Sequence, residues 1–472
     1  MGIPKYFSFI IKNYPNIIKN LDFFNEDGNK IHTLFLDSNS IIYDCVHKLD
    51  QSNYNSTSIF EDKIITDVIV YIDYIINLIK PYCNTYITFD GMPPFPKMQQ
   101  QRHRRLKTAF YESYKDTDKW SLNNITPCMD FMKKLSKRIN KYYENKSNIL
   151  CSCSDELGEG EHKIMEYIRN NNLTTKDVAI YGLDSDLIML SLVHLRYCGN
   201  IYVFREAPEF LKSKIPTKII HKTEIYFVDI RTLGNRIPVE MGWKNIDRML
   251  YEYVFLCFFL GNDFLPHILS INIHTNGFDI LFDAYKKALK ENDYLVNTDF
   301  TINWKNYNKL FKYLTKNEYS ILLSEFENIA LYRKRTRHIQ NDDDNMNNYK
   351  CLLEIPEKYV NVTEDGWRER LKKYRGLDNI SNKYCNRLNW VLNYYINGVN
   401  SDNFMAYEKP NINEPMLCEI SVLCEEVMKV ECSRLLGGLE REMMCEGEYR
   451  VYILGEGEGD ELKGKVICER YV

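Results

Sequence analysis

Residues 31–90 decide the fold, because two short β-rich runs flank one long apolar helix. The runs are IHTLFLD (31–37) and TYITFD (85–90), and the helix between them is DKIITDVIVYIDYIINLIK (62–80). Isoleucine and valine recur there at three- and four-residue spacing, which predicts a wide buried face, and Pro81 ends the helix. A strand, a crossover helix and a second strand in this order are typical of a parallel sheet.

The same alternation continues to about residue 205 and extends the predicted sheet. Three further strands are expected at NILCSCS (148–154), DVAIYGLD (177–184) and NIYVFRE (200–206). Residues 247–260 predict a buried helix, and the chain from about 281 to 400 has mostly helical patterning. The sequence therefore predicts an α/β fold, with a mostly parallel central sheet flanked by helices and a mainly helical second region.

Shifts in composition suggest three parts. The polar run NDDDNMNN (341–348) predicts an exposed loop, and no asparagine occurs after residue 413, where Glu, Gly, Met and Cys become frequent. We expect a core at 1–340, a second, mainly helical region at 341–413, and a compositionally distinct segment of open role at 414–472.

Composition excludes several classes of protein. The 472 residues are 44% hydrophobic and 27% charged, so the chain can bury a large core and is not disordered or fibrous. The net charge of −4 means that nucleic-acid binding has to come from a local basic patch.

The predicted compartment is intracellular. The fourteen cysteines are scattered without a CxxC pair, which argues against a zinc ribbon and favours a reducing environment. The longest strongly apolar run, 253–260, is too short to span a membrane, and the first residues lack the pattern of a signal peptide. We expect a cytoplasmic or nuclear protein with no membrane partner.

Acidic residues recur where the predicted strands end. In doubly wound sheets this edge is where ligands bind. Seven carboxylates belong to the set: Asp37, Asp90, Glu159, Glu161, Asp184, Asp186 and Asp263. One aspartate at a strand end is usually a cap or turn former, but seven at one edge require cations. The set predicts catalysis by two Mg²⁺ ions, which Mn²⁺ can replace, in the hydrolysis of a phosphodiester.

Two of these acids need a bent backbone to meet. Glu159 and Glu161 stand two residues apart in GEGEHKIMEYIR, and in a regular helix they would point about 200° apart. They converge only if Gly158 and Gly160 bend the start of the helix.

The strongest basic cluster follows Asp90 directly, in GMPPFPKMQQQRHRRLKTAFY (91–111). On a helix, four of its side chains fall within an arc of about 100°: Lys97, Gln101, Arg104 and Arg105. Guanidinium, ammonium and amide groups on one face form a phosphate receptor. A solvated basic surface is the plain alternative, and the position beside a predicted metal ligand favours the receptor.

Taken together, these motifs resemble the Xrn family of 5′-to-3′ exoribonucleases. The matching segments, in the family's order, are MGIPKYF, LFLDSNSIIYD, FDGMPPFPKMQQQRHRR, GEGEHKIM, YGLDSDLIML and FLGNDFLPH. GWRERLKKY and NWVLNYYINGV look like the family's second conserved region.

The resemblance implies a core like that of PIN domains and flap nucleases. It implies that the seven acids bind metal, and that the four residues of the basic cluster bind the 5′-monophosphate of single-stranded RNA. It further implies hydrolysis from that end with release of mononucleotides, in RNA decay.

Three departures from the family pattern stand out. Tyr43 takes the place of a histidine that stacks on the first base, and Asp402 and Phe404 stand where closely spaced tryptophans are usual. We expect Tyr43 and Phe404 to stack on bases, since every base offers a π-face. The family's larger members also continue into small β-rich domains, so this chain resembles a short member of viral or protist type.

Two alternatives remain open at this point. One is a structure-specific flap-type nuclease, which shares this kind of acidic sheet edge. The other is a catalytically weak homologue that binds RNA or a protein partner, and residues 414–472 are a candidate surface for such a partner.

Overall fold

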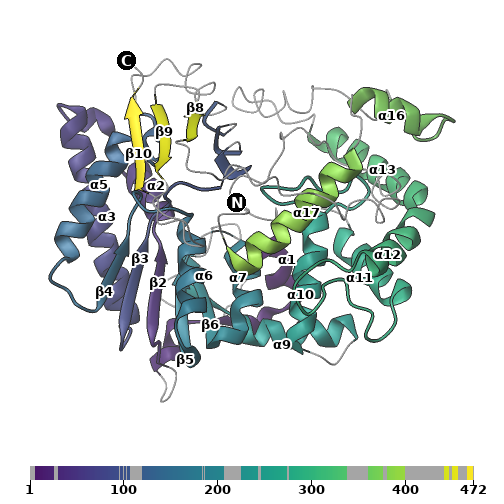
Figure 1. Cartoon of the computed structure of the whole chain (residues 1–472), viewed down its shortest axis with the longest axis horizontal. Helices are drawn as coiled ribbons and strands as arrows, with labels where there is room; N and C mark the ends of the chain where they lie inside the picture. Colours follow the sequence, from purple (N-terminus) through teal and green to yellow (C-terminus); the bar gives the residue numbers. More distant parts are fainter. Residues whose placement is uncertain are drawn as a thin grey trace. The chain divides into compact units, whose positions relative to one another are not determined.

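A seven-stranded sheet with helices on both faces dominates the computed structural model (Figure 1). The residues that it describes are 6–25, 30–94, 96–98, 100–102, 104–106, 120–182, 184, 186–206, 225–242, 246–273, 276–336, 360–375, 380–398, 441–445, 449–454 and 465–470. Among them, no helix combines the length and the apolar character needed to cross a bilayer.

The chain divides into two compact units. The sheet unit contains the described part of 7–237, the end of helix α17 (Ile380–Asn397) from Asn393 onward, and the C-terminal strands. The helical unit contains Tyr6 and the described part of 238–392. The predicted boundaries after residues 340 and 413 lie outside the described residues, so that division stays a prediction.

The sheet has the strand order β1-β7-β6-β5-β2-β3-β4. Its strands are β1 (Ile18–Lys19), β2 (Thr33–Asp37), β3 (Asn84–Thr88), β4 (Ile149–Ser152), β5 (Leu173–Tyr181), β6 (Cys198–Glu206) and β7 (Ile225–Asp229). The pairs from β4 to β6 are parallel, whereas β7 and β1 add an antiparallel edge. The prediction of a mostly parallel sheet is confirmed, and all five predicted strands form.

Strand register places the carboxyl ends of the parallel strands at one edge. Asp37, the last residue of β2, pairs with Thr88, the last of β3, and Thr88 pairs with Ser152, the last of β4. Tyr181 at the end of β5 pairs with Phe204 of β6. Residues that follow β2, β3 and β5 therefore start from the same side of the sheet.

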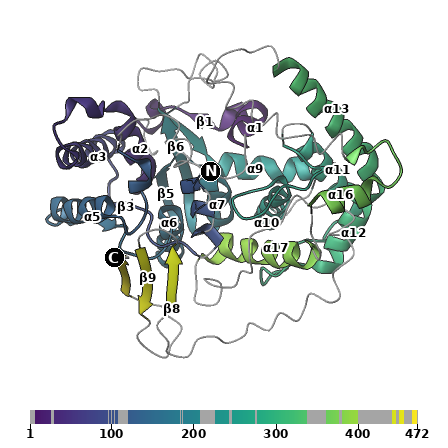
Figure 2. The ribbon, with the colours of Figure 1, turned by 90° about the horizontal axis from the view of Figure 1, so that it is seen from above.

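Helices and short 3₁₀ turns connect the strands of this unit. The helices are α1 (Tyr6–Asn13), α2 (Asn39–Lys48), α3 (Thr57–Ile79), α5 (Asp130–Tyr143), α6 (Gly160–Asn170), α7 (Asp186–His194) and α9 (Ile230–Met241). The first residue of α1 and the last residues of α9, from Pro238, belong to the helical unit. The 3₁₀ turns are η1 (Pro15–Ile17), η2 (Leu21–Asn25), η3 (Gln51–Asn53), η4 (Leu122–Asn124) and η5 (Leu195–Tyr197). Figure 2 shows α3 and α5 on one side of the sheet and α6 and α7 on the other.

The crossover helix α3 forms as its spacing predicts. Ile64, Val68 and Ile72 are fully buried on its inner face, and the Ser56 hydroxyl caps its start by accepting from the backbone N–H of Ile59. Lys80, directly before the proline, adopts a left-handed conformation that ends the helix.

The helical unit confirms that the fold contains a mainly helical second region. Most of its elements precede residue 340, so the predicted bounds of 341–413 stay a prediction. Its elements are α10 (Ile246–Cys257), η6 (Phe258–Leu260), α11 (Gly277–Ala288), α12 (Trp304–Lys316), α13 (Glu318–Thr336), α16 (Trp367–Arg375) and the first part of α17. The buried carboxylate of Glu252 fixes a loop here, because it accepts from the backbone N–H groups of Leu295 and Val296, each at 2.7 Å.

The C-terminal segment contains a separate antiparallel sheet of order β10-β9-β8. Its strands are β8 (Arg441–Cys445), β9 (Tyr449–Leu454) and β10 (Lys465–Arg470). The change in composition predicted a distinct element there, but not this structure.

Candidate active site

The predicted acids of the sheet unit gather around the carboxyl edge of the sheet. Asp37 ends β2, Asp90 follows β3, Asp184 follows β5, and Asp186 begins α7. Oδ1 of Asp37 is buried and has no hydrogen-bond partner among the described residues. A Cβ atom on Gly160 would lie 2.6 Å from this oxygen, so the start of α6 approaches Asp37 as closely as glycine permits.

Asp90 is held in place by two neighbouring elements. The Asn39 side chain donates to Asp90 Oδ2 at 2.6 Å and accepts from the Asp90 backbone N–H at 3.1 Å. The backbone N–H of Gly160 donates to the other carboxylate oxygen at 2.7 Å. One oxygen is thus oriented by a side-chain amide, and the other by a backbone N–H at the start of α6, where such groups lack helical partners.

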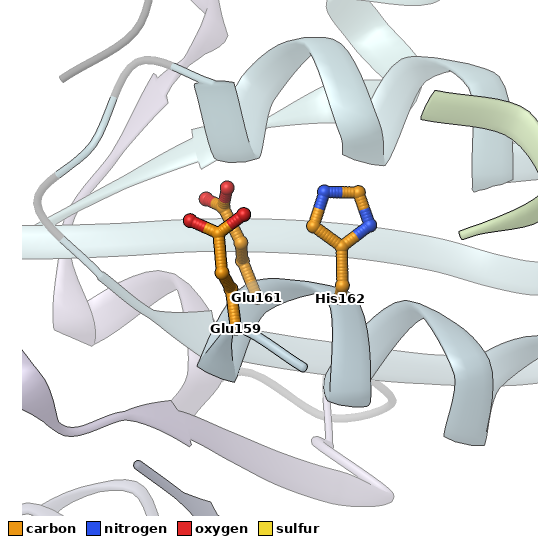
Figure 3. Close-up of side chains that lie close together, drawn as sticks. All are labelled: Glu159, Glu161 and His162. Carbon is orange, nitrogen blue, oxygen red and sulfur yellow. The ribbon is translucent and has the colours of Figure 1, made fainter. Parts of the chain in front are cut away.

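The two glutamates converge because the backbone bends before α6. Gly158 has a φ of 96° and Glu159 is extended, so the helix begins only at Gly160. Glu161 then lies in the first helical turn. One oxygen from each glutamate and one ring nitrogen of His162 lie within 4.8 Å of one another. Figure 3 shows the two carboxylates side by side, with the imidazole next to them.

Burial and repulsion from neighbouring carboxylates raise the pKa values of Asp37 and Glu161. Burial raises the pKa of Asp37 well above its usual range, and the charges of Asp90 and Asp184 add to the shift. The pKa of Glu161 is raised well above its usual range by burial and then by Glu159 and Asp186. A bound divalent cation would relieve this repulsion between carboxylates, since hard divalent ions prefer oxygen ligands.

The basic cluster divides into an inner and an outer part. The described residues within 96–106 are helical. Lys97 is 8% exposed, and its Nζ lies 2.7 Å from Glu159 Oε1. Gln101 and Arg105 are half-buried, and Arg104 is exposed. The lysine therefore belongs to the acidic cluster, whereas the outer three side chains are accessible to a ligand.

Tyr43 on α2 lies within electrostatic reach of both sets. Burial raises the pKa of its phenol, the charge of Arg104 lowers it and that of Asp90 raises it. The side chain is half-buried and packs against the hydrophobic core that includes residues of β2 and α3. Tyr43 thus lies near both Asp90 and Arg104.

Two predicted site residues are not placed with the others. Asp263 belongs to the helical unit, so its membership of the acidic cluster stays a prediction. Phe404, like Asp402, lies outside the described residues, and its stacking role also stays a prediction.

Sequence reasoning missed the residues that hold the acids. Besides Asn39, these are Tyr394, whose hydroxyl donates to Glu159, and Tyr395, whose hydroxyl donates to Asp186 at 3.0 Å. Both tyrosines belong to the segment NWVLNYYINGV, whose resemblance to a conserved region was the only signal for them.

Comparison with known proteins identifies the family. Residues 1–207 match the model of the XRN 5′-3′ exonuclease N-terminus, and residues 243–365 match that of the Xrn1 helical domain. The chain belongs to the Xrn family. The resemblance inferred from the motifs is thereby confirmed.

Its relatives are longer proteins. 5′-3′ exoribonuclease 1 of Saccharomyces cerevisiae is 31% identical over 385 residues, which cover 71% of this chain and 24% of that protein. The protein of the same name from Schizosaccharomyces pombe is 31% identical over 339 residues, covering 64% and 25%. 5′-3′ exoribonuclease 2 of Kluyveromyces lactis is 27% identical over 414 residues, covering 72% and 41%. The chain thus spans between about a quarter and two fifths of the length of these relatives.

Among solved structures, the catalytic core of Rad2 (complex I) superposes with a TM-score of 0.36 at 13% identity. The superposition covers 89% of this chain and 92% of that one, and it is too loose to add to the comparison of sequences.

Proposed function

We propose that this chain is a Mg²⁺-dependent 5′-to-3′ exoribonuclease that hydrolyses single-stranded RNA from a 5′-monophosphate end and releases mononucleotides, in RNA decay. The observation that carries the proposal is the acidic edge. There a buried Asp37 oxygen, which has no hydrogen-bond partner among the described residues, lies among carboxylates that repel it. Relatives named 5′-3′ exoribonucleases support the direction of attack and the substrate.

The residues at this edge fit divalent metal ions. The predicted ligands are all carboxylates, and hard cations such as Mg²⁺ and Mn²⁺ take oxygen ligands. Six acids of the sheet unit would hold two ions, with Asp263 as the seventh: Asp37, Asp90, Glu159, Glu161, Asp184 and Asp186. Such ions, when bound, activate a water nucleophile and stabilise the leaving oxygen of the phosphodiester.

The chain's own residues prepare the site for this chemistry. Asn39 and the Gly160 N–H fix the orientation of Asp90 without a ligand. Fixed donors and carboxylates need no reorganisation during the reaction, which lowers the barrier. The buried setting excludes water from part of the site and strengthens each electrostatic contact.

The outer basic residues would recognise the RNA end. Arg104 is exposed, and Gln101 and Arg105 are partly accessible. Guanidinium groups bind phosphate oxygens through paired, charge-assisted hydrogen bonds, which a 5′-hydroxyl end cannot accept. The half-buried ring of Tyr43, near Arg104 and Asp90, would offer a stacking surface for the first base.

The proposal is tested with 5′-labelled, 5′-monophosphorylated single-stranded RNA and Mg²⁺. We expect labelled mononucleotide as the first product and no product in EDTA. A flap-type nuclease would instead release an oligonucleotide from branched DNA. A binding protein would bind the RNA without cutting it. Either of those results in place of the mononucleotide would refute the proposal.

A further inference from the structure

The last turn of α17 contacts two of the acidic residues. The hydroxyl of Tyr394 donates to Glu159 Oε2, and the hydroxyl of Tyr395 donates to Asp186 Oδ1 at 3.0 Å. Both rings are buried, with exposed fractions of 1% and 3%, so solvent does not compete for these hydroxyls. Residues more than 200 positions along the chain thus complete the surroundings of the acidic cluster.

The phenol of Tyr394 is fixed at both of its ends. Its ring stacks on the imidazole of His162, with ring centroids 3.8 Å apart and planes at 30°. Its hydroxyl holds one oxygen of Glu159, while Lys97 Nζ holds the other at 2.7 Å. Because both oxygens have a donor, the Glu159 carboxylate cannot rotate freely.

The turn that carries both tyrosines is itself anchored. The N–H of Gly398, at a φ of 76°, donates to the Tyr394 carbonyl at 2.9 Å and ends the helix. The Arg169 guanidinium, which contacts His194 Nε2 at 2.8 Å, also reaches the carbonyl of Ile396. A Cβ at position 398 would lie 2.7 Å from this guanidinium, so glycine permits the approach.

We propose that Tyr394 and Tyr395 are positioning residues of the metal site, whose hydroxyls orient Glu159 and Asp186 for a divalent cation. Hydrogen-bond partners of metal ligands typically change metal affinity tenfold to a hundredfold when removed, because they fix ligand orientation and basicity. Neither tyrosine lies in the residues matched by the two family models, 1–207 and 243–365. The inference rests on the proposed function, since it assumes that the acidic edge binds metal.

The test uses Tyr394→Phe and Tyr395→Phe, which remove each hydroxyl and keep each ring. Tyr384→Phe is the matched control, because Tyr384 lies on the same helix, is fully buried, and has a hydroxyl without a hydrogen-bond partner among the described residues. Mn²⁺ binding to the full chain without RNA is measured by isothermal titration calorimetry. We expect affinity to fall about tenfold or more in each of the two variants and to stay unchanged in the control.

A second readout separates positioning from a purely structural role. In the two variants, the Mg²⁺ concentration for half-maximal activity should rise, while the KM for RNA stays at the wild-type value. Variants that bind Mn²⁺ like the wild type, even with a lowered melting temperature, would overturn the inference and leave the proposed function intact. A wild-type chain that binds no Mn²⁺ would overturn both.

Discussion

The acidic edge and the outer basic residues carry opposite charges and differ in how far the fold fixes them. Asp90 is held by Asn39 and a backbone N–H, and Glu159 is held by Lys97 and a tyrosine. Arg104, by contrast, is exposed on its helix. The fold thus orients the acids of the proposed reaction centre before substrate arrives. In the proposed end recognition, by contrast, the Arg104 guanidinium stays in water until a phosphate replaces that water.

Lys97 is the exception that connects the two regions. Helical spacing places Lys97 on the same helix face as Arg104, but its ammonium group is buried beside the Glu159 carboxylate. It therefore compensates one acid of the cluster in the absence of a cation. A role for the same lysine in binding the 5′-phosphate, as the family implies, would require it to serve both partners.

The largest expected effect comes from neutralising an acid of the edge. Asp184→Asn should abolish hydrolysis while leaving RNA binding largely intact, because an amide weakens cation binding and does not touch the basic helix. Cleavage is followed on monophosphorylated RNA, and binding by fluorescence anisotropy. Asp130→Asn on the exposed start of α5 is the control and should behave as wild type. If Asp184→Asn cleaved RNA at the wild-type rate, the assignment of a two-metal site would be contradicted.

A smaller effect, on stability, separates the inner and outer basic residues. Lys97→Met should lower the free energy of unfolding by about 3 kcal/mol in EDTA, because it leaves Glu159 buried without its ion-pair partner. Mg²⁺ should restore part of this loss by replacing the missing positive charge. Arg104→Ala, at an exposed site, should change stability by less than about 0.5 kcal/mol. Equal losses in urea titrations of the two variants would contradict the division into inner and outer parts.

The smallest effect concerns repulsion within the acidic edge. The pKa of Asp37 is higher in the folded chain than in the unfolded chain, whose aspartates titrate near about 4. As pH rises above that value, the unfolded chain loses the proton before the folded chain does, and the free energy of unfolding falls. Asp37→Asn should therefore melt higher than wild type at pH 7 in EDTA, by about 1 °C for each kcal/mol of repulsion removed. At pH 4 the difference in melting temperature between Asp37→Asn and wild type should be smaller.

Adding Mg²⁺ should reverse that order, because binding stabilises the wild type and the variant has lost a ligand. Melting curves of both proteins at both pH values, with and without Mg²⁺, check the prediction. A variant that melts lower than wild type in EDTA at pH 7 would show that repulsion does not limit the fold there.

Local patterns sufficed to predict most of the sheet unit. The spacing of Ile64, Val68 and Ile72 predicts α3, and the two glycines around Glu159 predict the bend that brings the glutamates together. The antiparallel edge was not predicted. Strand β1 has only two residues and therefore no readable alternation, and β7 is a short continuous apolar run, which periodicity does not distinguish from a buried helix.

Long-range contacts were beyond the sequence. The contact of Tyr394 with Glu159 joins residues 235 positions apart, and no periodicity encodes such a pairing. Helical spacing likewise places Lys97 and Arg104 on one helix face, but it does not show which of the two side chains is buried. Only the packed chain distinguishes the buried lysine from the exposed arginine.

The most direct test of the central claim, that the acidic edge cuts and the outer basic residues select the end, compares 5′ ends. Initial rates are measured for wild type and Arg104→Ala on matched 5′-monophosphate, 5′-hydroxyl and 5′-triphosphate RNA. We predict that wild type prefers the monophosphate, and that the variant loses about ten- to a hundredfold on it and much less on the hydroxyl. Equal wild-type rates on all three ends, or an equal proportional loss in the variant, would contradict the account.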